Sequence, residues 1–216
     1  MRRKVPQEHL YLVPLIFPGS KTTEFYTYLK ETVISLLYGP SSSVIPQINT
    51  LWIDLKDMPG VAHTSTTSED AKKKRITLSS QYFHSVFKGG NSEDTSASLL
   101  LKELKGVMVH EMVHVFQHDG QGSADPGLIE GIADYIRLKA NYAPVHWTKN
   151  KTRPWNAGYE VTAYFLLWVT MRGKGNGGFV QQLNDTLSNN KWEETLFEKL
   201  TGSSLDTLWK EYQKDT

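Results

Sequence analysis

The chain has 216 residues, no cysteine and nearly balanced charge, with 24 Lys and Arg against 23 Asp and Glu. This length supports one domain or two packed lobes, and 39% hydrophobic residues can fill a core, so a disordered chain is excluded. The lack of cysteine excludes disulfide scaffolds, Cys-ligated zinc fingers and thiol nucleophiles. Because the net charge is only +1, we expect no nucleic-acid partner for the surface as a whole.

The first part of the chain carries strand patterns around one helix. An apolar stretch at residues 10–17, interrupted by Pro14, predicts a strand, and residues 22–38 predict a helix with one buried stripe. Apolar and polar residues alternate over 48–57, and a further strand is expected over 75–80 after a polar loop. These strands are expected to form a small sheet.

From about residue 91 the pattern becomes helical. Apolar residues spaced three and four apart predict a long helix through Leu100 and Val115, which stops at Gly120. Asp125 and Pro126 provide an N-cap and a first turn for the next helix. Further helices are expected over residues 155–171, 179–187, 192–200 and 204–213.

Strands early in the chain and helices later define the fold class as α+β. We expect a single domain over residues 1–216, with a small N-terminal sheet lobe (about 1–90) packed on a mostly helical C-terminal lobe (about 91–216). A site is expected in the crevice between these lobes.

Targeting signals are weak in this sequence. The longest uninterrupted apolar run, residues 163–169, is far shorter than the roughly 20 residues that span a bilayer, so no membrane partner is expected. The start, Met1-Arg2-Arg3-Lys4, resembles a charged leader, but Pro14 interrupts the apolar stretch that follows it. We interpret the start as a mature or cytosolic N-terminus.

The motif with the clearest chemistry is His110-Glu111-Met112-Val113-His114, inside the long predicted helix. Histidines four residues apart project from one helix face and can bind one metal ion. Zinc suits them, because it binds neutral imidazole and a catalytic zinc site keeps one position open beside three protein ligands. Glu111 projects beside that position and can accept a proton from a water whose pKa the metal lowers. The alternative is an amphipathic helix with two histidines on its polar edge.

His118, Asp119 and Glu130 compete as the third ligand. His118 would be the third ligand on one straight helix after His110 and His114, and the three would span about 12 Å, too far to bind one ion. Asp119 would point nearly a quarter turn away from the face that carries the histidines. Glu130 lies early in the next helix, which can fold back over the histidines. Asp134, one turn further, is placed to accept the free ring N–H of a histidine ligand, His110 in our assignment. The alternative is that Glu130 and Asp134 are simply acidic residues near a helix N-terminus, where the helix dipole favours negative charge.

The stretch HEMVHVFQ at residues 110–117 and the stretch GLIEGIADY at residues 127–135 resemble the plant basic secretory protein family. The similarity continues at residues 57–62, 158–166, 178–184 and 208–209, in order over roughly residues 48–213. Two departures are His118, where plant members usually have Trp, and the near-neutral charge.

This resemblance implies a secreted zinc metallopeptidase of the gluzincin-like kind, with a zincin-like active-site helix and Zn²⁺ as cofactor. It implies His110, His114 and Glu130 as metal ligands and Glu111 as catalytic base.

Stabilising the oxyanion needs a further hydrogen-bond donor, and Tyr159 is our first candidate. It follows Trp155-Asn156-Ala157-Gly158 at an expected helix start, where its phenol can face the crevice. Tyr135 is the second candidate, and packing of Tyr159 in the core is the alternative. The strand at 75–80 precedes the active-site helix, so its edge is expected to pair with an extended peptide.

The sequence therefore predicts a monomeric zinc metallopeptidase that acts on peptide or protein substrates. Glu111 would activate the water and later protonate the leaving amine. The alternative is a metal-stabilised defence or binding protein without turnover. Lys72-Lys73-Lys74-Arg75 is interpreted as a solvated approach to a strand rather than a polyanion site.

Overall fold

The computed structural model describes residues 7–9, 12–17, 19–40, 42, 44–67, 70–172 and 178–215. The charged start at Met1 to Lys4 lies outside them. The chain divides into two compact units, residues 1–32 with 46–115 and residues 33–45 with 116–216. The unit that holds the sheet thus extends beyond residue 90, where the sequence placed the end of the sheet lobe. The single domain expected over the whole chain stays a prediction.

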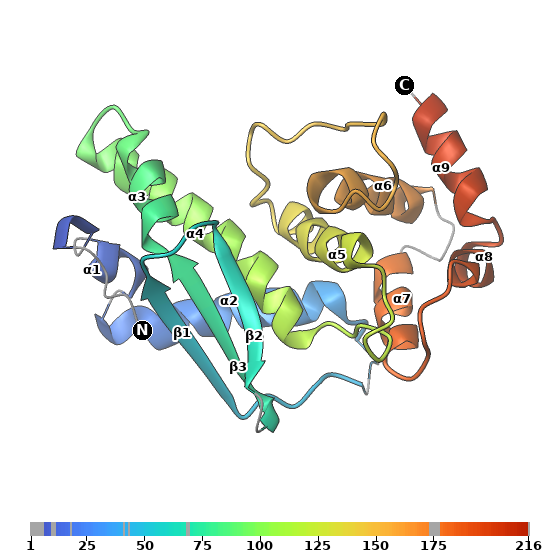
Figure 1. Cartoon of the computed structure of the whole chain (residues 1–216), viewed down its shortest axis with the longest axis horizontal. Helices are drawn as coiled ribbons and strands as arrows, with labels where there is room; N and C mark the ends of the chain where they lie inside the picture. The colour runs from blue at the N-terminus through green and yellow to red at the C-terminus, as the bar shows by residue number, and fades with distance from the viewer. Residues whose placement is uncertain are drawn as a thin grey trace. The chain divides into compact units, whose positions relative to one another are not determined.

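The first unit combines a small sheet with helices, as an α+β fold requires (Figure 1). Its three strands have the order β1-β3-β2, with β3 parallel to β1 and antiparallel to β2. Its elements are η1 (Gln7–His9), α1 (Leu12–Ile16), η2 (Gly19–Lys21), the first part of α2 (Thr22–Leu37), β1 (Thr50–Lys56), β2 (Ala62–Thr67), β3 (Asp70–Ser79), α3 (Ser80–Lys88) and nearly all of α4 (Glu93–Phe116).

Several sequence predictions for this unit are wrong, each for a local reason. Residues 12–16 form a helix rather than a strand, because Pro14 lies in the first turn, where a missing N–H breaks no helical hydrogen bond. The polar loop contains β2, whose β-branched threonines favour a strand. The helix α3 was not predicted; its N-cap is Ser79, whose Oγ accepts a hydrogen bond from the Tyr82 backbone N–H at 3.2 Å.

The position of β3 changes the interpretation of the sheet edge. Because β3 pairs with β1 on one side and β2 on the other, it offers no free edge to a peptide. Among the described strands, β1 and β2 are the edges. The expected pairing of an extended peptide with the strand at 75–80 is therefore wrong.

Two polar contacts attach α4 to the rest of the first unit. The Thr64 hydroxyl of β2 lies 3.0 Å from the Glu111 carbonyl oxygen of α4. The Tyr82 hydroxyl of α3 donates to Glu103 Oε1 of α4 at 2.7 Å. Apolar side chains of α4 are buried along most of its length, among them Leu100, Leu104, Val107, Met108, Met112 and Val113. The helix that carries the histidine motif is thus a core element, with hydrogen bonds to β2 and α3.

The second unit is helical, and its elements lie close to their predicted ranges. They are the last part of α2, α5 (Pro126–Lys139), α6 (Tyr159–Met171), α7 (Phe179–Leu187), α8 (Thr195–Thr201) and α9 (Leu205–Lys214). The predicted cap of α5 is confirmed, since Asp125 Oδ1 accepts from the backbone N–H groups of Gly127 and Leu128 at 2.8 and 3.3 Å. The side chains of Phe165, Phe179 and Phe197 are fully buried in its core.

The close packing of α5 against α6 depends on a glycine. A Cβ atom at Gly131 would lie 2.2 Å from Cγ2 of Thr162 in α6, a distance that no side chain can occupy. Glycine therefore lets the two helices approach at the level of Glu130, which precedes it.

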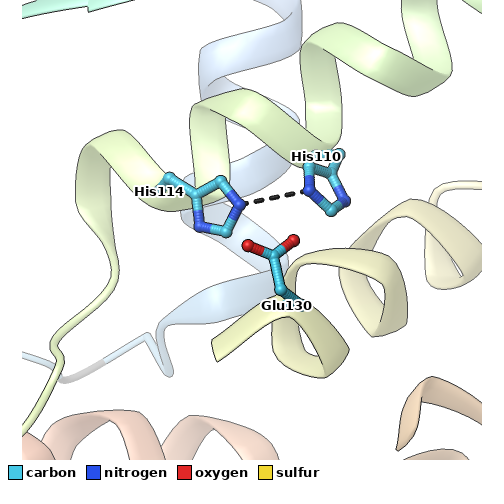
Figure 2. A group of neighbouring side chains, drawn as sticks. All are labelled: His110, His114 and Glu130. Atoms are coloured by element: carbon cyan, nitrogen blue, oxygen red, sulfur yellow. Dashed lines mark hydrogen bonds between the residues drawn. The ribbon is translucent and has the colours of Figure 1, made fainter. Parts of the chain in front are cut away.

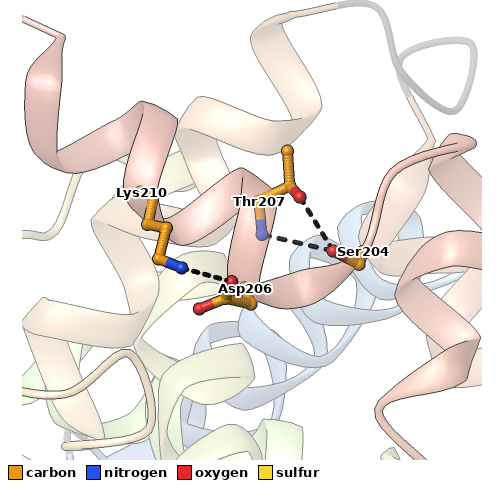
Figure 3. A network of polar contacts seen from close by, with 4 residues as sticks. All are labelled: Ser204, Asp206, Thr207 and Lys210. Atoms are coloured by element: carbon orange, nitrogen blue, oxygen red, sulfur yellow. Dashed lines mark hydrogen bonds and ion pairs between the residues drawn. The ribbon is translucent and has the colours of Figure 1, made fainter.

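The first turn of α9 is stabilised by its own polar side chains (Figure 3). Ser204 Oγ accepts from the Thr207 backbone N–H at 3.3 Å and lies 2.9 Å from the Thr207 hydroxyl oxygen. Lys210 and Asp206 form an exposed ion pair at 2.7 Å. This capped start confirms the helix expected after residue 204. None of the helices in the described part of the chain is long and apolar enough to cross a membrane.

Candidate metal centre

The two motif histidines project from one face of α4, as their spacing predicts. Their Nε2 atoms lie 3.1 Å apart, and their ring planes cross at 83°. His110 is 8% exposed, whereas His114 is half-buried. Two nitrogen ligands at about 2.0 to 2.1 Å from a tetrahedral ion stand about 3.4 Å apart, so this pair is spaced to share one cation.

Glu111 directly follows His110 in the sequence. Its side chain is buried, with 5% of the residue's surface exposed. The Thr64 hydroxyl on β2 donates to its Oε2 atom at 2.6 Å. Its other carboxylate oxygen, Oε1, has no hydrogen-bond partner among the described residues. One oxygen of this carboxylate is therefore anchored, and the other remains available as a proton acceptor.

Glu130 lies in the second turn of α5, whose position within its own unit is closely restricted. A Cβ atom at Gly127 would lie 1.9 Å from the Asn156 carbonyl oxygen. The Asn156 amide in turn donates to Asp125 Oδ2 at 2.9 Å. A Cβ atom at Gly158 would lie 3.6 Å from the Glu130 Cβ. The backbone around residues 156–158 therefore packs directly against the start of α5 and places the Glu130 side chain beside Gly158.

The side chains of His110, His114 and Glu130 form a group that could hold a metal ion. One ligand atom from each lies within 4.8 Å of the other two. Figure 2 shows the Glu130 carboxylate directed toward the two imidazole rings. Two imidazoles and one carboxylate are also a donor set found at catalytic zinc sites, where a fourth position stays open. The residues present thus fit a divalent cation in number, in type and in the spacing of the histidines.

A family model covers most of the chain. The model of the BSP family, described as a peptidase of plants and bacteria, matches residues 16–212. The chain belongs to the BSP family. The resemblance to the basic secretory protein family is thereby confirmed. No curated protein and no solved structure matches the chain.

The two other candidates for third ligand have structural roles in this BSP family member. The helix α4 ends at Phe116, so His118 lies beyond it rather than one further turn along it. The His118 ring nitrogen Nε2 lies 2.9 Å from the Val44 carbonyl oxygen. Asp119 is exposed and accepts from the Gly122 backbone N–H at 3.0 Å. Among the described residues, neither belongs to the group that could hold a metal ion.

Asp134 lies one turn after Glu130 on α5, and only 3% of its surface is exposed. A buried carboxylate requires compensating hydrogen bonds or charges, so a role inside the protein is favoured over a surface acid near a helix N-terminus. Its assignment as the acceptor for a histidine ring N–H stays a prediction.

Tyr159 is 52% exposed, so it does not pack in the core with the buried Phe165. It is the first residue of α6, with a φ of +50°, directly after Gly158, which packs against Glu130. Tyr135, the second candidate, is 5% exposed, and burial raises the pKa of its phenol. Exposure and chain position therefore favour Tyr159 over Tyr135 as a donor to a substrate.

Thr64 is the one residue of this centre that the sequence did not indicate. It lies on β2, in the segment predicted to be a polar loop. The run Ala-His-Thr-Ser-Thr-Thr at residues 62–67 has a strand-like content of β-branched residues, which could have revealed the strand but not its contact with Glu111.

Proposed function

We propose that this chain is a zinc-dependent metallopeptidase in which His110, His114 and Glu130 hold the ion and Glu111 is the general base. The observation that carries the proposal is that one ligand atom from each of these three side chains lies within 4.8 Å of the other two. The buried Glu111 directly follows one of them, His110, in the sequence. Membership of a peptidase family supports the reaction class. The substrates would be peptides or proteins, bound by a monomer.

Bound Zn²⁺ would supply Lewis-acid chemistry, polarising the scissile carbonyl and lowering the pKa of water. Glu111 accepts the proton of the attacking water through Oε1, while Thr64 holds Oε2. When the C–N bond of the peptide breaks, the same carboxyl group delivers that proton to the leaving amine. One carboxylate thus serves as base and then as acid.

Two further residues support the reaction in this proposal. Asp134 accepts a ring N–H from His110 and keeps the opposite nitrogen directed at the ion. Tyr159 donates a hydrogen bond from its phenolic O–H to the carbonyl oxygen as negative charge develops there. Its exposure at the start of α6 leaves the hydroxyl accessible to a bound peptide.

The decisive experiment compares Glu111→Gln with Glu103→Gln. Both residues lie on α4, and both carboxylates accept a hydrogen bond from a hydroxyl group, Glu103 from Tyr82 and Glu111 from Thr64. We expect Glu111→Gln to retain stoichiometric zinc and the parent melting temperature but to lose at least about 100-fold in kcat on a casein or peptide-library substrate. Glu103→Gln should cleave like the parent.

Two results would reject the proposal. If Glu111→Gln cleaved casein as fast as the parent, Glu111 would not be the base. Stoichiometric zinc in the parent protein without cleavage of any library peptide at any pH would favour the non-catalytic metal-stabilised protein instead.

A further inference from the structure

The second unit contains a pocket of about 380 Å³ that is remote in sequence from the histidine motif. It is lined by residues 149 and 151, by residues of α6 from Tyr164 onward with Arg172 directly after the helix, and by Tyr212 and Asp215 at the end of α9. Pockets of roughly 300 to 1,000 Å³ accept small organic molecules. The volume far exceeds that of one water molecule, about 30 Å³, so it can accept more than a bare ion.

Three cations line this pocket, and each lies over an aromatic ring. Lys149 Nζ is 5.9 Å from the ring centre of Tyr164, and Lys151 Nζ is 4.7 Å from that of Tyr212. The Arg172 guanidinium carbon is 4.7 Å from the Trp168 ring. Cation–π attraction favours these positions. The cations cover ring faces that could otherwise stack on a neutral ligand.

The pocket already binds one carboxylate, which belongs to the chain itself. Asp215 accepts a hydrogen bond from the Trp168 indole N–H and forms an ion pair with Arg172 at 2.8 Å. Lys151 donates to the backbone carbonyl of Asp215. The hydrogen bonds from Trp168 and then Arg172 hold the pKa of the Asp215 carboxyl below its usual value. Indole N–H and guanidinium therefore form a site with demonstrated complementarity to a carboxylate.

Positive charge remains in excess at this site. Asp215 is the one carboxylate among the described lining residues, against three cations. Burial raises the pKa of Tyr212 to about 12, so this phenol stays neutral at physiological pH. The wall also has an apolar part, which includes Leu167 and Met171, the latter 77% exposed. A ligand that matches both parts carries a negative group on an apolar body.

We propose that this pocket binds a small organic carboxylate with an apolar body, whose carboxylate replaces that of Asp215 between Trp168 and Arg172. The excess cations favour an anionic ligand over a neutral one. The planar guanidinium favours a carboxylate, with which it forms two parallel hydrogen bonds. The site is independent of the peptidase proposal, because it uses none of the residues of the metal centre.

The test uses 3-phenylpropionate as probe and the full-length protein labelled with ¹⁵N. Binding is followed by the indole N–H resonance of Trp168, which Trp168→Phe identifies by its loss. We expect saturable binding of 3-phenylpropionate and none of 3-phenylpropanamide, its neutral analogue. Arg172→Gln should weaken the Kd at least about tenfold, because a charge-assisted hydrogen bond contributes about 1.5 to 3 kcal/mol. Asp215→Asn should tighten it several-fold, since the internal competitor is removed.

Lys210→Gln is the matched control, because it removes one cation from α9 outside the pocket. Its Kd should equal that of the parent. Equal binding of the amide, parent-like binding by Arg172→Gln, or unchanged or weaker binding by Asp215→Asn would each overturn the proposal. A shift of the Trp168 resonance produced equally by sodium sulfate would show general anion attraction and would also overturn it.

Discussion

The Thr64 hydroxyl on β2 donates a hydrogen bond of 2.6 Å to Oε2 of Glu111 on α4. The contact joins an edge strand to the helix that carries the histidine motif, and it leaves the second carboxylate oxygen of Glu111 without a partner among the described residues. A hydrogen bond to one oxygen of a buried carboxylate compensates part of the cost of its burial and favours one orientation of the group. Thr64 therefore determines the direction in which Glu111 presents its accepting oxygen.

If Glu111 is the general base, Thr64→Val should lower kcat by at least about tenfold, because a hydrogen bond to a charged group contributes about 1.5 to 3 kcal/mol. Valine keeps the shape and the β-branch of threonine but cannot donate. The Michaelis constant should change little, since Thr64 holds the base rather than the substrate. Steady-state kinetics on one library-derived peptide measures both.

Thr64→Ser is the matched variant, because it restores the hydroxyl without the methyl group. We expect it to recover most of the parent kcat, with zinc content unchanged in both variants. A valine variant as fast as the parent, or a serine variant as slow as valine, would show that Thr64 does not position Glu111.

Asp134 is predicted to orient a histidine ligand, so Asp134→Asn should weaken zinc affinity by about 10- to 100-fold. The carboxamide retains the size of the side chain but is a poorer acceptor. The affinity is measured by competition with a chromophoric chelator, and Asp119→Asn is the control because Asp119 is exposed and bonds to Gly122. Equal zinc affinity in the two variants would remove Asp134 from the centre.

Tyr159 is predicted to stabilise the developing oxyanion. Tyr159→Phe should therefore lower kcat by about 100-fold, a typical loss when one such donor is removed, with little change in the Michaelis constant. Tyr28→Phe, which removes another exposed phenol, serves as control. Because Tyr159 is half-exposed, the melting temperature should not change. A parent-like kcat would leave the oxyanion donor unidentified.

Features that depend on neighbours along the chain were predictable from the sequence. The spacing of His110 and His114 places both on one helix face, and Asp125 followed by Pro126 starts α5 where predicted. The helices of the second unit also lie close to their predicted ranges, since apolar periodicity and caps are local signals.

Features that depend on pairing between distant segments were not predictable. The strand β2 is polar and only partly buried, and it forms because β3 supplies its hydrogen-bond partners. The central place of β3 follows from the order of pairing, which no residue of β3 encodes by itself. The role of Thr64 was missed for the same reason, since its partner lies 47 residues away in the sequence.

The start of α9 offers a test of stability that is separate from the metal centre (Figure 3). Ser204→Ala removes the hydroxyl oxygen that accepts from the Thr207 backbone N–H and should lower the free energy of unfolding by about 1 kcal/mol. Ser204→Asp should restore it, because aspartate is an equally good N-cap and favours the positive end of the helix dipole. Lys210→Gln should cost less than about 0.5 kcal/mol, since its ion pair with Asp206 is exposed on both sides. Urea unfolding followed by tryptophan fluorescence ranks the three variants, and a larger loss in Lys210→Gln than in Ser204→Ala would mean that the ion pair, rather than the cap, stabilises this helix.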